Sequence, residues 1–305
     1  MTDIYLISGF LGAGKTTLLQ KLLREAFSET PVALVENDFG SVSLDSAILK
    51  EQGYSVKEIH SGCICCSLTG DFVGAVSALL KQQKPEILLV EPSGVAKLSE
   101  VEALCRNPKI ASLAAVRQKI TVVDAEHCCT YCNNFGEFFE DQITHAHTIV
   151  FSHSEQPSAK LEQAQALVHR LNPFAAAFSG SWDSLNVLDI LTPQKSESRF
   201  SRSHFLRPLP SENSFSSMTF PFSHPVELTQ LAQALTKLQD AACGTVLRVK
   251  GIVQTRSFPV QLQFVCGQWT TEPTTLEGNE ICIIGKALNE DALKAIFAPL
   301  GSDPQ

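Results

Sequence analysis

A short glycine-rich stretch near the N-terminus has the residue pattern of a phosphate-binding loop. Residues 9–16 read GFLGAGKT, which fits G-x-x-x-x-G-K-[ST]. An apolar run precedes the stretch and a helical pattern follows it, as this pattern requires. In such a loop the backbone N–H groups surround phosphate oxygens, and the dipole of the following helix strengthens their field. We therefore expect a nucleotide to bind here, through Gly9, Gly12, Ala13, Gly14, Lys15, Thr16 and Thr17.

The reacting end of the nucleotide would meet a smaller set of side chains. Lys15 would reach the β- and γ-phosphates, and the hydroxyl of Thr16 would bind Mg²⁺. A nucleotide hydrolase also needs a carboxylate at the end of a neighbouring strand, and Glu91 directly follows the apolar residues 87–90. Residues 91–94 read EPSG and resemble the D-x-x-G turn, whose glycine amide senses the γ-phosphate. Lys15, Glu91 and Gly94 are therefore the candidate catalytic residues.

An acidic segment between these two motifs has the character of a switch. Residues 36–40 read ENDFG and directly follow a predicted strand. The carboxylates of Glu36 and Asp38 would complete a metal shell when a triphosphate is bound. We assign Asp38 to the Mg²⁺ site, together with Thr16 and Glu91.

Three thiols within the sequence CICC form a second kind of site. Cys63, Cys65 and Cys66 directly follow Gly62, and thiolates favour Zn²⁺ and other late divalent metals. Adjacent cysteines pair poorly with each other, which argues against a local disulfide. Three ligands leave one tetrahedral position open for a carboxylate, water or a client's ligand, which suits metal transfer better than storage. Redox chemistry and a role as small buried side chains are the alternatives.

A second group of thiols follows later in the chain. Cys128, Cys129 and Cys132 come directly after His127, and their spacing suits a metal. Thiols at the start of a helix without a ligand, and a redox pair, are the competing interpretations.

The elements that would position these residues alternate between strands and helices. Apolar runs predict strands at residues 4–8, 31–35, 86–90, 120–124 and 148–152, and amphipathic patterns predict helices at 16–26, 71–82 and 158–171. Such alternation is typical of a mostly parallel sheet with helices on both faces. We therefore expect residues 1–193 to form a doubly wound α/β domain of the P-loop NTPase type.

The remainder of the chain has a different pattern. Residues 194–217 are rich in serine, contain two prolines and show neither periodicity, so we expect a linker. Strands at 218–222, 245–254, 259–266 and 281–285, with helices at 225–241 and 289–297, predict a smaller α+β domain at residues 218–305. Trp269 stands beside turn residues and receives no role.

Composition excludes several classes of protein. The chain has 305 residues, of which 44% are hydrophobic and 18% charged, so it is not wholly disordered and is long enough for about two domains. A net charge of −8 argues against a nucleic-acid polymer as partner. No apolar run approaches a membrane span, and residues 1–7 lack the basic region of a signal peptide. Ten cysteines are too dilute for a disulfide scaffold, so we expect a reducing, cytoplasmic setting in which clustered thiols bind metal or do redox chemistry.

Five motifs in fixed order add up to a family resemblance. GFLGAGKTT at 9–17, ENDFG at 36–40, GCICC at 62–66, EPSG at 91–94 and VVDA at 122–125 resemble the CobW-type P-loop metallochaperone GTPases, relatives of the nickel-insertion GTPases of hydrogenase and urease. The resemblance covers most of residues 1–175, and the second domain is similar to the family's C-terminal domain in length and pattern.

The resemblance implies a mechanism. Cys63, Cys65 and Cys66 would hold Zn²⁺ or a similar ion such as Co²⁺ or Ni²⁺, with Glu36 as an additional ligand. Hydrolysis of GTP, with Mg²⁺, would then favour release of the metal to a client metalloprotein. Whether the protein forms a homodimer is left open.

Base recognition departs from the family pattern. Relatives carry N-K-x-D, whereas this chain has Ser152, His153, Ser154 and Glu155. Glu155 would accept hydrogen bonds from guanine and His153 would stack on the base, but Ser152 is too short to brace the loop as asparagine would. GTP is the expected nucleotide, with ATP as the alternative. A nucleotide-regulated metal sensor or store with weak turnover, and a thiol redox sensor, are the other functions considered.

Overall fold

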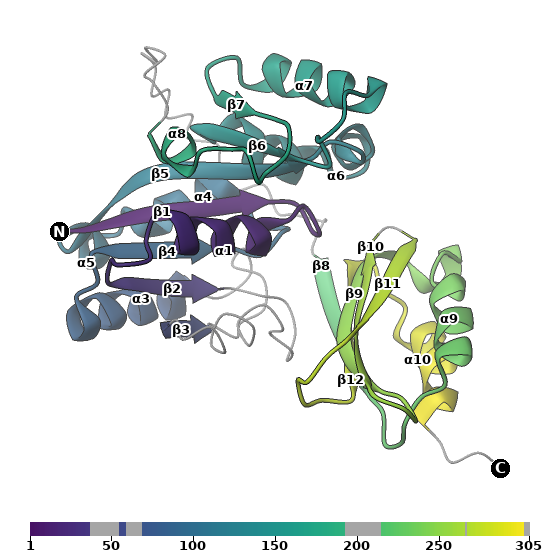
Figure 1. The fold of residues 1–305 in the computed structure, drawn as a ribbon. Coiled ribbons are helices and arrows are strands. Elements are labelled where there is room, and N and C mark those ends of the chain that lie inside the picture. Colours follow the sequence, from purple (N-terminus) through teal and green to yellow (C-terminus); the bar gives the residue numbers. More distant parts are fainter. Residues whose placement is uncertain (37–54, 59–68, 193–214, 266, 302–305) are drawn as a thin grey trace. The chain divides into compact units, whose positions relative to one another are not determined.

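The computed structural model describes residues 1–36, 55–58, 69–192, 215–265 and 267–301, which divide into two compact units (Figure 1). We call the part from β1 to α8 the N-terminal unit and the part from β8 to η2 the C-terminal unit. Asp38, Cys63, Cys65 and Cys66 lie outside the described residues, as does most of the expected linker. The predictions made for them stay predictions.

The N-terminal unit is built on a parallel sheet. Seven strands lie in the order β3-β2-β4-β1-β5-β6-β7, and each adjacent pair is parallel. This confirms the predicted α/β class and every strand predicted in this half of the chain, while β3 and β7 are additional. The strands are β1 (Thr2–Gly9), β2 (Val32–Glu36), β3 (Ser55–Glu58), β4 (Ile87–Glu91), β5 (Ala114–Asp124), β6 (Thr148–Ser152) and β7 (Ala176–Phe178).

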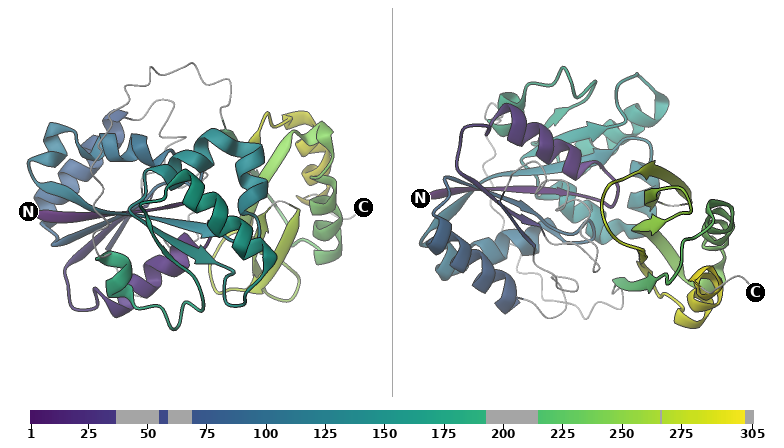
Figure 2. Two further views of the ribbon diagram at one scale, coloured as in Figure 1. Left: turned by 90° about the horizontal axis from the view of Figure 1, so that it is seen from above. Right: turned by 60° about the horizontal axis from the view of Figure 1, so that its bottom comes forward.

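Helices cover both faces of this sheet. The helices are α1 (Lys15–Glu25), α3 (Thr69–Gln83), α4 (Leu98–Cys105), α5 (Pro108–Ala111), α6 (Cys128–Thr144), α7 (Ala159–Leu171) and α8 (Val187–Leu191). Helices α1 and α8 contact each other on one face, and α3, α4, α5 and α6 form a contacting group on the opposite face (Figure 2). The chain runs outward from β1 to β2 and later crosses to β5 on the other side of β1. Because such crossovers are right-handed, the two directions place their helices on opposite faces.

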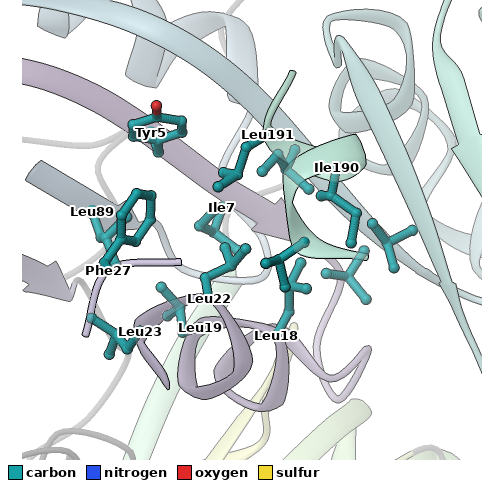
Figure 3. Close-up of a cluster of buried hydrophobic side chains, with 14 of the residues drawn as sticks. Tyr5, Ile7, Leu18, Leu19, Leu22, Leu23, Phe27, Leu89, Ile190 and Leu191 are labelled. Atoms are coloured by element: carbon teal, nitrogen blue, oxygen red, sulfur yellow. The ribbon is translucent and has the colours of Figure 1, made fainter. Parts of the chain in front are cut away.

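Helix α1 is fixed by its apolar stripe. Its leucines recur at helical spacing and are buried against β1, β4 and α8 (Figure 3). Burying a leucine side chain contributes about 1.5–3 kcal/mol relative to leaving it exposed. The first residue of α1, Lys15, is therefore carried on a rigid element. The buried side chains of this cluster include Tyr5, Ile7, Leu18, Leu19, Leu22, Leu23, Leu89, Ile190 and Leu191.

The carboxyl ends of the strands bring the candidate residues to one edge of the sheet. Gly9 ends β1, Glu36 ends β2 and Glu91 ends β4. Asp124 and Ser152 end β5 and β6 and are paired in register. Ligands of open α/β sheets bind beyond this edge, beside the strand from which the chain turns in both directions. That strand is β1, which leads directly into the phosphate loop.

The C-terminal unit is an antiparallel sheet with two helices, which confirms the predicted α+β class. Its strand order is β11-β10-β9-β12-β8. Alternate residues of β10 are buried, and Val260, Leu262 and Phe264 join the core formed with α9 and α10. The elements are β8 (Phe215–Pro221), α9 (Leu228–Lys237), η1 (Ala241–Cys243), β9 (Thr245–Gln254), β10 (Pro259–Val265), β11 (Gln268–Pro273), β12 (Glu280–Lys286), α10 (Glu290–Phe297) and η2 (Ala298–Gly301).

This unit differs from the sequence prediction at β8, α9 and β11. β8 begins at Phe215, so residues 215–217 belong to a strand that pairs with β12 and not to the linker. Helix α9 is shorter than the predicted 225–241, because Asp240 accepts a hydrogen bond from the Ala242 N–H and starts a separate 3₁₀ turn. Trp269 lies in β11, a strand missed because its side chains are mostly exposed. Within the described ranges, none of the helices is long and apolar enough to cross a membrane.

Candidate functional site

The phosphate loop joins the end of β1 to the start of α1. Gly14 precedes α1 with φ of 98°, in the left-handed region that favours glycine. No side chain caps the helix at this position. The N–H groups at the start of a helix are a typical anion-binding site, and the helix dipole favours negative charge there. Thr16 is half-buried and Thr17 exposed beside them.

Lys15 folds back over the loop. Its side chain is buried, with Nζ lying 3.7 Å from Oε1 of Glu91 and donating to the Phe10 carbonyl at 3.5 Å. A buried ammonium group needs such partners because burial removes its hydration. The ion pair joins the two predicted catalytic side chains, Lys15 at the start of α1 and Glu91 at the end of β4.

Two buried carboxylates stand side by side at the edge of the sheet. Glu36 and Glu91 are paired in register as the last residues of β2 and β4, with 3% and 5% of their surfaces exposed. Like charges held this close in a buried site favour a divalent cation, and oxygen donors are the ligands that Mg²⁺ prefers. Glu91 and the Thr16 hydroxyl are thus oxygen donors of the kind that fits Mg²⁺, and the third predicted donor, Asp38, lies outside the described residues. The assignment of Glu36 to the transition metal stays a prediction.

The turn after β4 is pressed against the phosphate loop at Gly94. A methyl group on Gly94 would lie 2.8 Å from the Leu11 nitrogen, so only glycine permits this approach. On its other side, the carbonyl of Gly94 accepts a hydrogen bond from Nε2 of Gln142, which also donates to the Ala96 carbonyl. The turn therefore links the loop to α6. Gln142 was missed from the sequence because one buried glutamine in a helix carries no motif.

Asp124, in the VVDA motif, organises the start of α6. Its Oδ1 accepts from the N–H groups of Glu126 at 2.9 Å and His127 at 3.3 Å, and its Oδ2 lies 2.9 Å from Nδ1 of His127. Asp124 therefore holds its contacts within its own loop.

The expected base-reading residues follow β6, two strands from the phosphate loop. Ser152 and Ser154 are buried, whereas His153 and Glu155 are exposed, and His153 has φ of 52°. The structure thus separates the four residues into two that are buried and two that face outward. Glu155 is therefore accessible to a base.

Comparison with known proteins places these features in a family. Residues 3–179 match the model of the CobW/HypB/UreG nucleotide-binding domain. The chain belongs to the CobW/HypB/UreG family. Residues 215–300 match the model described as the cobalamin synthesis protein cobW C-terminal domain, so both units of this CobW-family chain are accounted for.

Individual relatives extend over different shares of the chain. A zinc chaperone of Escherichia coli, YjiA, is 27% identical over 97% of this chain and 98% of its own length. A second E. coli zinc chaperone, YeiR, is 34% identical, over 54% of this chain and half of its own. The crystal structure of zinc-bound YjiA GTPase is 20% identical, with 99% of each chain covered and a TM-score of 0.44.

The second thiol group of this CobW-family chain does not gather into a metal site. Cys128 is fully buried, and burial is the main cause that raises the pKa of its thiol to about 12. Burial, followed by the charge of Glu140, also raises the pKa of Cys132. Across the part of the chain that the structure describes, no group of three or more His, Cys, Asp or Glu side chains is arranged to hold a metal. The geometry favours the interpretation as thiols at the start of a helix, and Cys128 is the first residue of α6.

Proposed function

We propose that this protein is a metal-transfer GTPase that couples binding and hydrolysis of GTP to delivery of Zn²⁺ to a client metalloprotein. The proposal rests mainly on the alignment of three glutamates, each of which is the last residue of a strand in the parallel sheet. Glu91 pairs with Glu36, and Glu36 pairs with Glu58, the last residue of β3. Cys63 follows Glu58 by only a few residues in the sequence. The full-length similarity to the zinc chaperone YjiA supports zinc as the cargo.

The phosphate loop supplies the binding half of the reaction. The first-turn N–H groups of α1 and the ammonium group of Lys15 surround the β- and γ-phosphates. In doing so Lys15 exchanges its contact with Glu91 for contacts with phosphate oxygens, which frees the Glu91 carboxylate to bind a cation or orient water. Bound Mg²⁺ would neutralise charge that develops on the phosphates, and Thr16, Glu91 and Asp38 would hold it.

The Gly94 turn supplies the link to the nucleotide state. Its close approach to Leu11 puts a backbone amide beside the phosphate loop, so the turn responds when the terminal phosphate leaves. The carboxylate of Glu36, next to Glu91, connects the same edge of the sheet to the segment that follows β2.

The thiols supply the cargo site. Cys63, Cys65 and Cys66 hold Zn²⁺, with Glu36 completing the tetrahedron. Glu36 belongs both to the zinc site and to the predicted switch segment, so the affinity for zinc depends on which nucleotide is bound. Hydrolysis therefore weakens the zinc site, and the client receives the metal. Co²⁺ and Ni²⁺ fit the same donors and are to be compared with Zn²⁺.

Zinc titration tests this proposal. Zn²⁺, Co²⁺ and Ni²⁺ are titrated into the wild type and a Cys63/Cys65/Cys66→Ser variant in the presence of GTP, GDP, ATP or ADP, and phosphate release is followed in parallel. The matched control replaces Cys128, Cys129 and Cys132 with serine. We expect the first variant to lose Zn²⁺ binding and the control to keep it.

Three outcomes would contradict the proposal. Zinc bound equally by both thiol variants would remove the cargo site. Zinc binding without phosphate release would indicate a sensor or store. Loss of free thiols on oxidation, with no metal bound by the reduced protein, would indicate a redox sensor.

A further inference from the structure

An aromatic side chain reaches the phosphate loop from a segment that belongs to none of the motifs. Trp182 follows β7, and its indole N–H donates to the Phe151 carbonyl at 2.7 Å. A methyl group on Gly14 would lie 3.3 Å from Cη2 of Trp182 and 3.8 Å from Cβ of Ser152. The edge of the indole ring therefore stands directly against the loop glycine that precedes Lys15, beside the end of β6.

A second tie holds the same two loops together. The Ser154 hydroxyl accepts from the Gly180 N–H at 3.0 Å and lies 3.0 Å from the Phe151 carbonyl, to which it donates. Ser154 is buried. The end of β6 and the loop that follows it are thus fixed to the loop after β7 at two points, by Ser154 in the loop and by Trp182, which contacts the Phe151 carbonyl at the strand end.

The size of residue 152 explains why the indole fits. Trp182 and the Cβ of Ser152 both border the space next to Gly14, and serine ends at Oγ whereas asparagine is larger by an amide group, so a small residue at 152 leaves room beside the indole ring. Ser152 is 8% exposed, and its hydroxyl has no hydrogen-bond partner among the residues that the structure describes. A buried hydroxyl without a partner is costly, so Ser152 is not held in place by a hydrogen bond of its own side chain.

We infer that Trp182 is the positioning residue that braces the base-binding loop, residues 152–155, against the phosphate loop, in place of a longer side chain at position 152. The inference rests on the proposed use of a nucleotide. Trp182 holds the loop for any purine, while Glu155, exposed at its end, supplies the preference for guanine. The ligand class of this side of the site is therefore the purine nucleoside, held separately from the phosphates.

The test separates the nucleoside from the phosphates. Dissociation constants for GDP, ADP and inorganic tripolyphosphate are measured for the full-length wild type and for the Trp182→Ala, Trp182→Phe, Ser152→Asn and Trp182→Ala/Ser152→Asn variants. We expect Trp182→Ala to weaken GDP and ADP by about tenfold each and to leave tripolyphosphate unchanged. Trp182→Phe, which keeps an aromatic ring and loses the N–H donor, should fall between. Ser152→Asn alone should weaken GDP, because the amide and the indole compete for one space, and the double variant should bind GDP better than Trp182→Ala.

Fluorescence energy transfer from Trp182 to a labelled nucleotide tests their proximity without relying on the stability of a variant. The chain has two tryptophans, so a Trp269→Phe protein reports on Trp182 alone. With a fluorescent N-methylanthraniloyl GDP we expect strong transfer from Trp182, which the Trp182→Phe/Trp269→Phe protein loses. Equal transfer in these two proteins would overturn the inference.

Other results of these experiments would also decide whether the bracing role and the proposed function hold. GDP binding unaffected by Trp182→Ala, tripolyphosphate weakened in the same proportion as GDP, or a double variant no better than Trp182→Ala would each contradict the bracing role. A wild type that binds nucleotides as expected but never couples them to zinc would overturn the proposed function and leave the role of Trp182 standing. A wild type that binds no nucleotide would overturn both.

Discussion

The phosphate side and the base side of the candidate site are held together in different ways. On the phosphate side, Gly14, Lys15, Glu91 and Gly94 all belong to sequence motifs, and their contacts lie around the end of β1. On the base side, the loop after β6 is fixed by Trp182, which belongs to no motif. Phosphate binding needs a particular backbone path and a cation, so its sequence is constrained. Bracing a loop needs only a filled space and a hydrogen bond, which several side chains can supply.

This contrast predicts that changes on the two sides differ in size and in kind. Changes on the phosphate side should abolish binding and turnover for every nucleotide. Changes on the base side should alter which nucleotide is preferred and leave the phosphates alone.

Loss of the loop cation should have the largest effect. Lys15→Ala removes the charge that meets the terminal phosphates, and we expect phosphate release to fall by at least about 100-fold for GTP and ATP alike. The control is Arg24→Ala, on the same helix, where the side chain is exposed and pairs with Glu25. Steady-state phosphate assays check both. Residual turnover of Lys15→Ala within a few-fold of the wild type would show that the loop does not carry the reaction.

A single methyl group at Gly94 should have the next largest effect. Gly94→Ala forces the turn away from the Leu11 nitrogen, and we expect turnover to fall by about 10- to 100-fold, because small displacements at a reacting centre are costly. Gly74→Ala in α3 is the matched control, since a methyl group there meets nothing within 4 Å. Equal turnover in the two variants would argue against the turn as a sensor of the γ-phosphate.

Glu155 should affect only the choice of base. Glu155→Gln removes the carboxylate that accepts from guanine, and we expect the ratio of ADP to GDP dissociation constants to fall by about tenfold with tripolyphosphate binding unchanged. Glu162→Gln, exposed on α7, is the control. If both variants kept the same ratio, the guanine preference would have to come from another group.

We expect the smallest effect from the pair of His145 and Asp141, which lies outside both the phosphate side and the base side of the site. A side-chain hydrogen bond to Asp141 is the main cause that raises the pKa of His145 above its ordinary value. The protonated form is therefore stabilised in the fold, so this contribution is fully present below the unfolded pKa of about 6.5 and is lost as pH rises through the folded pKa. We expect His145→Asn to cost less than about 1 kcal/mol, as for other partly exposed pairs, and to cost less still at about pH 8 than at pH 6. Urea unfolding at both pH values checks this, and a larger cost at the higher pH would refute it.

The sequence alone was sufficient to predict those strands and helices whose pattern lies within a short stretch of residues. The buried strands β1, β4 and β6 are continuous apolar runs, and α1 has its leucines at helical spacing. It was insufficient for β11, whose exposed side chains show no alternation. Helix α6 was anticipated only as a helix start, although Cys128, Tyr131 and Phe135 recur at helical spacing and are buried, and its backbone departs from helical geometry at Phe135.

The same distinction applies to the candidate site. Lys15 and Glu91 are found together as their motifs predict. Gln142 and Trp182 act through hydrogen bonds to backbone carbonyls far away in the sequence, two from Gln142 and one from Trp182. Such contacts leave no pattern in one sequence, because any residue can supply a carbonyl.

The affinity for Zn²⁺ in the two nucleotide states tests the central claim most directly. Competition with a zinc chelator, in the presence of a non-hydrolysable GTP analogue or of GDP, gives the dissociation constant for each state of the wild-type protein. Coupling energies between linked sites are typically large enough to change affinity by about 5- to 150-fold. We predict tighter zinc binding with the triphosphate analogue, with the difference lost in Lys15→Ala. Equal zinc affinity in the two states would contradict it.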